Sequence, residues 1–417
     1  MKQPAAGRHE TVNLWLSVAG QGVSSLGHYL FSFAMGLYVL SLTGSAQSYA
    51  VTVAVSLLPS AVLSPIVGAL ADRVSKKLLV VLSDTCNCVL LLCAFLVALA
   101  RQLTVGDVYL ITFLMSVISP FVNVTFTAAA PRLVSDRLLS RLTSYRTAVS
   151  SVIQVATPVL SGAVYVVLDI RLFILFSSIA YGLSALSELF IDFNFNPLAE
   201  ASETRESFMQ SLRSGASYLL SSRVMVAIVT LMLLVNLWFA ALDAVLPYSM
   251  LEIIGLNEST YGVIMAAFSV GTLLGSVYVG RRDLRFSRRL VSVSLALCAL
   301  LMVWLAIPMG VAMPAPLASV LLFTGCAAIG LVCAFINVPS SVFIQRLVPG
   351  ELLGRIGGLL STINMVMSPV GMLLFGTLAD HIHPSIILMA CAAMVGAVAL
   401  LCRRMTSFDE SAARLTQ

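Results

Sequence analysis

The chain has 417 residues, of which 59% are hydrophobic and only 10% are charged. A soluble protein carries about a quarter charged residues, so this composition cannot cover a water-exposed surface. The apolar runs lack the length and alternation of barrel strands, which predicts an all-α membrane protein. The net charge of +5 does not indicate nucleic-acid binding, because the basic residues follow the membrane topology described below.

Twelve segments are apolar over roughly 20 residues, the length that a helix needs to cross a bilayer. The first is too long for a signal peptide, and no small-residue cleavage site follows it. The expected spans form two sets of six: Val12–Leu40, Ala50–Leu70, Leu78–Leu99, Val105–Phe126, Leu142–Leu168 and Leu172–Ile191, then Val224–Leu246, Tyr261–Val279, Leu290–Val311, Pro316–Val338, Ile356–Ala379 and Ser385–Cys402.

The basic residues fix the expected orientation. With twelve spans, both ends of the chain lie on one side, and 22 of the 24 Lys and Arg fall on that side. Only Arg101 and Arg171 fall on the other. Because cytoplasmic loops carry such an excess, the sequence predicts that both termini are cytoplasmic.

The chain divides into two similar parts. Residues 1–191 and 224–417 each hold six spans, and residues 192–223 form a polar linker. Apolar residues recur in the linker at helical spacing, which predicts an amphipathic helix that lies either in the membrane interface or in solvent. Asn123-Val124 and Arg132-Leu133-Val134 recur 214 residues later as Asn337-Val338 and Arg346-Leu347-Val348. Repeats of six spans are typical of transporters whose site lies between the halves near the membrane midplane.

The loop after the second span carries the most informative motif. It reads Gly68-Ala-Leu-Ala-Asp72-Arg73-Val-Ser75-Lys76-Lys77 and resembles the signature G-x-L-x-D-R-x-G-R/K-R/K of the major facilitator superfamily, with Ser75 in place of the second Gly. The resemblance implies a fold of twelve helices in two six-helix halves and a conformational latch at this loop.

Each latch residue has an expected role. Gly68 permits close helix approach, and Asp72 faces the positive end of a neighbouring helix, which we expect to be the span beginning near Ile356. Arg73, Lys76 and Lys77 pair with acids or lipid phosphates when the halves close. Asp84, about two turns into the third span, is expected to pair with this basic cluster and to belong to the latch.

Two further stretches carry resemblances within the superfamily. In the fifth span, Pro158 and Gly162 match the motif of its antiporters, although Thr157 and Ser161 replace two glycines. This implies a kinked or closely packed helix and favours export over import. Ala130–Val134, with Asn13-Leu14-Trp15 and Gln21, resembles the macrolide-efflux and siderophore-exporter branch, which implies a bacterial plasma membrane.

Ionisable side chains inside the bilayer are costly and mark functional sites. Asp243 lies deep in the seventh span and is the first candidate for proton coupling, as a carboxyl withdrawn from water. Its alternative role is a structural hydrogen bond. Glu188 lies near the cytoplasmic end of the sixth span and is a further candidate for proton coupling, although its side chain could instead snorkel to the interface. His28 in the first span is another candidate, and its alternative role is a hydrogen bond in the core.

Uncharged polar residues within the spans are candidates for a substrate cavity. Amides also hold helices together, so a packing role remains open for each. With one aromatic residue beside them, the candidates are Asn123, Gln154, Asn236, Trp238, Asn337 and Asn364.

The sequence offers no other source of energy than an ion gradient. None of the three lysines follows a Gly-x-x-x-x-Gly pattern, and no catalytic or metal-binding constellation appears, so we expect no enzyme, cofactor or metal. The eight cysteines lie within spans and behave as small hydrophobes. The sequence predicts a monomeric, proton-coupled exporter of small amphipathic molecules, such as macrolide-like drugs or siderophores. A metabolite importer on the same fold is the first alternative, and a non-transporting membrane sensor or scaffold is the second.

Overall fold

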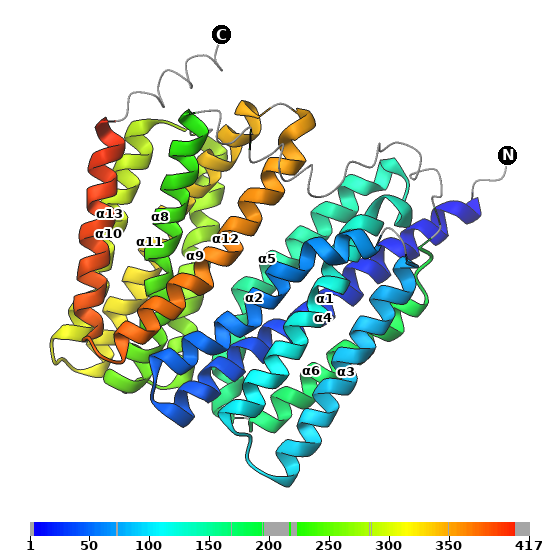
Figure 1. Cartoon of the computed structure of the whole chain (residues 1–417), viewed down its shortest axis with the longest axis horizontal. Helices are drawn as coiled ribbons and strands as arrows, with labels where there is room; N and C mark the ends of the chain where they lie inside the picture. Colours follow the sequence, from blue (N-terminus) through cyan, green and yellow to red (C-terminus); the bar gives the residue numbers. More distant parts are fainter. Residues whose placement is uncertain are drawn as a thin grey trace. The chain divides into compact units, whose positions relative to one another are not determined.

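The computed structural model describes residues 4–71, 74–167, 169–193, 195, 217, 223–282, 284, 286–348 and 350–404. These residues form twelve long α-helices (Figure 1). Each expected span falls on one of the helices, so the all-α fold class is confirmed. The helices are α1 (Pro4–Thr43), α2 (Ala46–Ala71), α3 (Lys76–Ala100), α4 (Val105–Leu133), α5 (Asp136–Val167), α6 (Ile170–Leu189), α8 (Arg223–Tyr248), α9 (Glu258–Arg282), α10 (Arg288–Gly310), α11 (Ala315–Leu347), α12 (Gly350–Ala379) and α13 (Pro384–Arg404).

Ten of the described helices are long and apolar enough to cross a membrane on their own. They do not include α5, whose first three turns carry Asp136, Arg137, Arg141 and Arg146. In α12 the apolar stretch is the shorter segment Met365–Ala379. One π-helical turn, η2 (Ser249–Ile253), continues α8 shortly after Pro247.

The chain folds into two compact units. The first contains residues 1–42 and 55–208, and the second contains residues 43–54 and 209–417. The beginning of α2 is therefore counted with the second unit and the rest of α2 with the first. Most of the expected linker 192–223 lies outside the described residues, so its amphipathic helix stays a prediction.

In the first unit, α6 buries an unusually polar face. Residues Ser177, Ser178, Tyr181, Ser184 and Glu188 are all buried and recur at helical spacing; we call them the polar strip. Ser177 Oγ donates to the Gly27 carbonyl at 3.1 Å, and Ser184 Oγ to that of Gly20 at 3.0 Å. Ser178 Oγ donates to the Cys88 carbonyl of α3 at 2.8 Å. Such bonds between side chain and backbone hold helices together where no water is present.

In the second unit, α9 and α11 pack through glycine. A Cβ on Gly275 would lie 2.5 Å from the Leu331 carbonyl oxygen. A Cβ on Gly271 would overlap the Ala327 carbonyl oxygen, and one on Gly330 that of Phe268. Only a residue without a side chain allows the two backbones to approach this closely.

The start of α2 is anchored within the second unit by the end of α12. Ser45 Oγ donates to Asp380 Oδ2 at 2.6 Å, and the Ala46 backbone N–H donates to Asp380 Oδ1 at 2.8 Å. A Cβ on Gly376 would lie 2.9 Å from the Ala46 carbonyl oxygen. Asp380 thus caps the N-terminus of α2 from another helix, as a negative charge at that end should.

Candidate functional site

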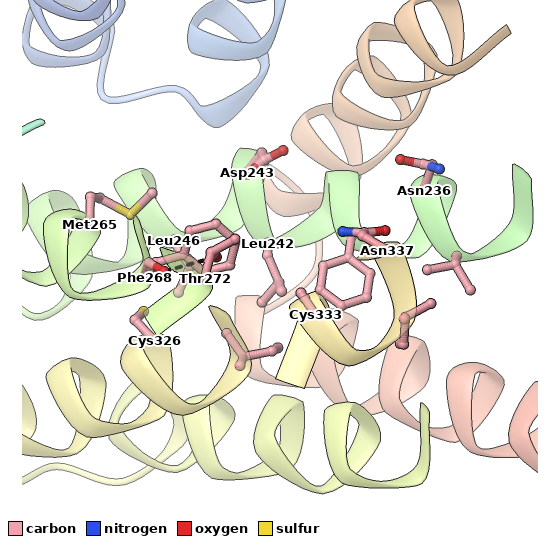
Figure 2. Close-up of a pocket in the computed structure, with 14 residues that line it drawn as sticks. Asn236, Leu242, Asp243, Leu246, Met265, Phe268, Thr272, Cys326, Cys333 and Asn337 are labelled. Carbon is pink, nitrogen blue, oxygen red and sulfur yellow. Dashed lines mark hydrogen bonds between the residues drawn. The ribbon is translucent and has the colours of Figure 1, made fainter. Parts of the chain in front are cut away.

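The second unit contains a cavity of about 310 Å³ between α8, α9 and α11. Its volume is in the range of sites that take small molecules. Fourteen residues line it: Val235, Asn236, Phe239, Leu242, Asp243 and Leu246 from α8, Met265, Phe268 and Thr272 from α9, and Cys326, Ile329, Cys333, Ile336 and Asn337 from α11 (Figure 2).

The cavity gathers three of the polar residues that the sequence singles out. Asn236 and Asp243 are seven residues apart, which is close to two turns, so they lie on one face of α8. Asn337 approaches from α11, and Figure 2 shows the three on the same side of the cavity. One carboxyl and two amides therefore line one wall of the site.

Asp243 combines an enclosed position with access to the cavity. Protein atoms surround it, as expected for a carboxyl withdrawn from water, and its side chain has accessible surface where it lines the cavity. The cavity supplies access for water or a polar ligand that a packed helix interface would deny. The Asp243 carboxyl is consequently reachable without any change in the packing of α8.

The rest of the cavity wall is apolar and polarisable. Met265 and Phe268 from α9, Phe239 from α8, and Cys326 and Cys333 from α11 face the space. Methionine and cysteine adapt to irregular shapes, and rings stack on flat apolar groups. Such a wall can contact the apolar part of a ligand. The polar side of the cavity can then orient one polar or charged group of the same ligand.

Two tyrosines that the sequence analysis did not select lie near Asp243. The Tyr49 and Tyr261 side chains are hydrogen-bonded to each other, and Asp243 is close enough to interact electrostatically with both. Tyr49 belongs to the start of α2, which is part of the second unit. The local sequence contains no signal for Tyr49, because its position depends on the docking of α2 through Asp380.

The other expected cavity residues lie elsewhere or outside the described side chains. Trp238 packs its ring 5.8 Å from that of Phe375 on α12 and does not line the cavity. Asn123 is exposed on α4 in the first unit. The side chains of Gln154 and Asn364 lie outside the described residues.

The motif after α2 is described only in part. Asp72 and Arg73 lie outside the described residues, so their latch role stays a prediction. A Cβ on Gly68 would meet Val124 Cγ1 at an ordinary 3.8 Å, so the described residues show no close helix approach there. Lys77 Nζ donates to the Leu189 carbonyl at 2.6 Å, and Lys76 begins α3.

Ser75, which replaces a glycine of the superfamily signature, has a structural role. Its side chain accepts a hydrogen bond from the Leu78 N–H at 3.4 Å and caps α3. A serine is among the best residues for this position. The departure from the signature thus places a cap at the start of α3.

Asp84 and Glu188 lie together. The sequence places Asp84 with the basic residues of the latch, but the structure buries it completely against Ser184 and Glu188 of α6. Glu188 is equally buried and does not snorkel. His28 Nδ1 lies 3.2 Å from the Tyr181 hydroxyl in the same unit.

The residues that resemble the macrolide-efflux branch and the antiporter motif contribute to helix packing. Asn13 Nδ2 donates to the Leu133 carbonyl at 3.2 Å and to the Asp192 carbonyl at 3.1 Å. Gln21 Oε1 accepts from Arg146 Nε at 2.5 Å. Pro158 lies inside α5, which continues through it, and Gly162 is buried one turn further.

Comparison with known proteins agrees with this architecture. Macrolide efflux protein A of Streptococcus pyogenes is 21% identical over 386 residues, which cover 92% of this chain and 93% of the relative. The uncharacterized MFS-type transporter YfiS of Bacillus subtilis (strain 168) is 25% identical over 401 residues, covering 92% and 91%.

Solved structures share the fold at low sequence identity. A single-residue variant of the nucleoside transporter NupG has a TM-score of 0.73 at 14% identity and covers 95% of this chain and 100% of its own. A bacterial homologue of the iron transporter ferroportin in an inward-facing state has a TM-score of 0.67 at 18% identity, covering 95% and 99%.

The family assignment rests on almost the whole chain, because the model of the transmembrane secretion effector family matches residues 6–416. The chain belongs to this family of major facilitator superfamily transporters, in the branch that contains the macrolide efflux proteins.

Proposed function

We propose that this multi-pass membrane transporter is a proton-coupled exporter of small amphipathic compounds, such as macrolide-like drugs or siderophores. It acts as a monomer in a bacterial plasma membrane, with both termini in the cytoplasm. The observation that carries the proposal is the cavity of the second unit, in which the Asp243 carboxyl is exposed beside an apolar, sulfur-rich wall.

The shape and chemistry of the cavity support an amphipathic substrate. A volume of about 310 Å³ accepts one apolar ring system or chain of a ligand, which the aromatic and sulfur side chains contact by dispersion. Among the described residues, no Lys or Arg lines this cavity, so its described lining does not favour an anion. The low-identity resemblance to macrolide efflux protein A favours export of such compounds over import of a metabolite.

Asp243 couples the substrate to protons by exchange. A carboxyl that lines the cavity loads a proton when the cavity opens to the side of higher proton concentration. A cationic or hydrogen-bonding substrate that arrives from the cytoplasm then binds the carboxyl only when the proton leaves. Alternating access between two facing states makes this exchange an antiport.

The test is proton movement in everted membrane vesicles that contain the protein, measured with a pH-sensitive dye while lipophilic drugs are added. Asp243→Asn keeps the size of the side chain and removes its titration. Asp169→Asn is the matched control. Asp169 caps α6 by accepting from the Arg171 N–H at 2.8 Å, and Asn caps equally well. The ion pair that the change also removes, with Arg171 Nε at 3.8 Å, joins two exposed side chains and contributes little. We expect drug-induced proton release in wild type and in Asp169→Asn but not in Asp243→Asn.

Other outcomes contradict the proposal in different ways. Release that survives Asp243→Asn keeps the antiporter and removes Asp243 from the coupling. Drug-induced uptake of protons in place of release would favour an importer. No response to any compound, in vesicles shown to contain the protein, would contradict export of amphipathic drugs.

A further inference from the structure

The polar strip of α6 places Glu188 against a second carboxyl, Asp84 of α3, and the cavity of the second unit accounts for neither. Asp84 of α3 and Glu188 of α6 lie within hydrogen-bonding reach of each other, and both side chains are 0% exposed. Among the described residues, no hydrogen-bond partner is found for either Asp84 oxygen or for Oε2 of Glu188. The Ser184 hydroxyl is near both carboxyls and donates to Oε1 of Glu188. Two carboxyls in contact with so few donors require an explanation.

No nearby positive charge explains how the two carboxyls can be buried together. No Lys or Arg of the described residues forms an ion pair with either carboxyl or contributes to its electrostatic environment. On α3, Lys77 is engaged by the Leu189 carbonyl. Behind α1, Arg146 is held by Gln21 and by the Phe126 carbonyl at 3.4 Å. Two negative charges in contact in a dry interior, without a cation, are prohibitively costly.

Neutral polar groups complete the surroundings. Ser184 Oγ lies 3.2 Å from Glu188 Oε1, but its single hydrogen is shared with the Gly20 carbonyl at 3.0 Å. Tyr181 faces Asp84 and also contacts His28 of α1. On α4, which packs against α3, the described ionisable residues Asp107, Tyr109 and Arg132 lie near the ends of the helix.

A second, independent observation points to the same place. Asn87 lies one turn beyond Asp84 on the same buried face of α3 and is 1% exposed. Within the described part of the chain, neither its amide nitrogen nor its amide oxygen has a partner. Because most buried amides are satisfied, this layer of α3 holds more polar atoms than the described hydrogen bonds satisfy.

We propose that Asp84 and Glu188 bind one proton between them, which makes the α3–α6 interface a second protonation site, separate from Asp243. The proton turns one carboxyl into an O–H donor toward the other, so both open acceptors gain a partner and one negative charge is removed. On release, the proton passes to water or toward Tyr181 and His28. The role of this site in transport rests on the proposed function, but the bound proton itself does not.

Infrared difference spectroscopy of the purified protein in detergent tests the site, because the carbonyl stretch of a protonated carboxyl is distinct from that of a carboxylate. We expect a protonated-carboxyl band at neutral pH that disappears as pH is raised. The band should persist in Asp243→Asn. It should be lost in the double variant Asp84→Asn with Glu188→Gln, whose amides replace the shared proton with N–H donors.

A band that is unchanged in the double variant, or its absence from wild type, would overturn the proposal. If the double variant does not fold, the single variant Glu188→Gln tests the same point, because its amide donates to Asp84 and removes the need for the proton. The experiment needs no substrate. If the infrared band is present but the vesicles show no drug-induced proton release, only the proposed function is contradicted. If the vesicles release protons but the band is absent, only this second protonation site is contradicted.

Discussion

The two units treat polar groups inside the bilayer in opposite ways. In the first, the polar strip of α6 is turned inward, and its serines bond to the backbone of neighbouring helices. The two carboxyls between α3 and α6 in this unit, Asp84 and Glu188, are completely buried. In the second, α9 and α11 pack through glycine, and the carboxyl of Asp243 is left open to a cavity.

An acidic residue inside the bilayer can therefore serve in helix packing, as in the first unit, or line a cavity, as in the second. Where polar side chains fill a helix interface, as on α6, they bond to the backbone of the neighbouring helices. Where small residues provide the contact, the packing needs no polar groups, and those that remain can face a substrate. This contrast supports the proposal that the substrate binds in the second unit.

The largest effect should come from the glycine contacts of the second unit. Gly271→Val places a side chain on the Ala327 carbonyl oxygen, which should cost more than about 3 kcal/mol and prevent stable folding. Thermal unfolding in detergent measures it. Gly280→Val is the control, because a Cβ there has nothing within 4 Å. In the first unit, a Cβ on Gly20 would crowd the movable Ser187 hydroxyl and make ordinary contacts with Ser187 Cβ and Ser184 Oγ. Gly20→Ala should therefore cost much less than Gly271→Val, and equal losses would contradict this difference between the units.

The next effect is chemical. A lipophilic carbodiimide should modify Asp243, whose side chain is exposed, and should leave Asp84 and Glu188 unmodified, because both are 0% exposed. Mass spectrometry of peptides from the treated protein distinguishes these sites, with Asp243→Asn as the blank. Modification of Glu188 before Asp243 would show that the α3–α6 interface opens more readily than the structure suggests.

A smaller loss is expected at the cap of α2. Asp380→Ala removes the acceptor for both Ser45 and Ala46 and should lower the free energy of unfolding by about 1–2 kcal/mol. Asp380→Asn keeps one acceptor oxygen and should lose less. The same unfolding assay compares them, and equal stability of all three proteins would contradict a cap.

The smallest effect should come from Tyr181→Phe. It removes the hydroxyl that contacts His28 at 3.2 Å and should cost about 1 kcal/mol, the usual worth of one hydrogen bond. Unfolding of the variant at neutral pH measures this. Tyr38→Phe removes a tyrosine hydroxyl that donates to the Leu103 carbonyl at 3.1 Å in the same unit and serves as a comparison. A much larger loss in Tyr181→Phe would mean that the hydroxyl also supports the carboxyl pair.

The fold could be predicted from the sequence because its signal is local. Each span is a continuous apolar run, and hydropathy alone locates it. Asn236 and Asp243 could be selected in the same way, since each is a polar residue deep in an apolar helix. Trp238 could have been separated from them by helical geometry, because a residue two positions from Asn236 lies almost on the opposite face of α8.

The carboxyl pair could be predicted only in part. The spacing of Ser177, Tyr181, Ser184 and Glu188 does indicate one polar face of α6, a signal that the sequence analysis overlooked. The partner of that face could not be found, because nothing local states that α3 packs against α6 with Asp84 at the level of Glu188. The basic residues beside Asp84 in the sequence were therefore a misleading guide to its neighbours in space.

The docking of α2 limits how modular the two halves can be. The internal repeat divides the sequence once, near the central linker, whereas residues 43–54 belong to the compact unit formed by the later residues. A hybrid that joins the first six helices of this protein to the last six of a relative would have to recreate the contact of Ser45 and Ala46 with Asp380. Exchange between relatives should succeed only when the loop between α1 and α2 is inherited together with the last helices.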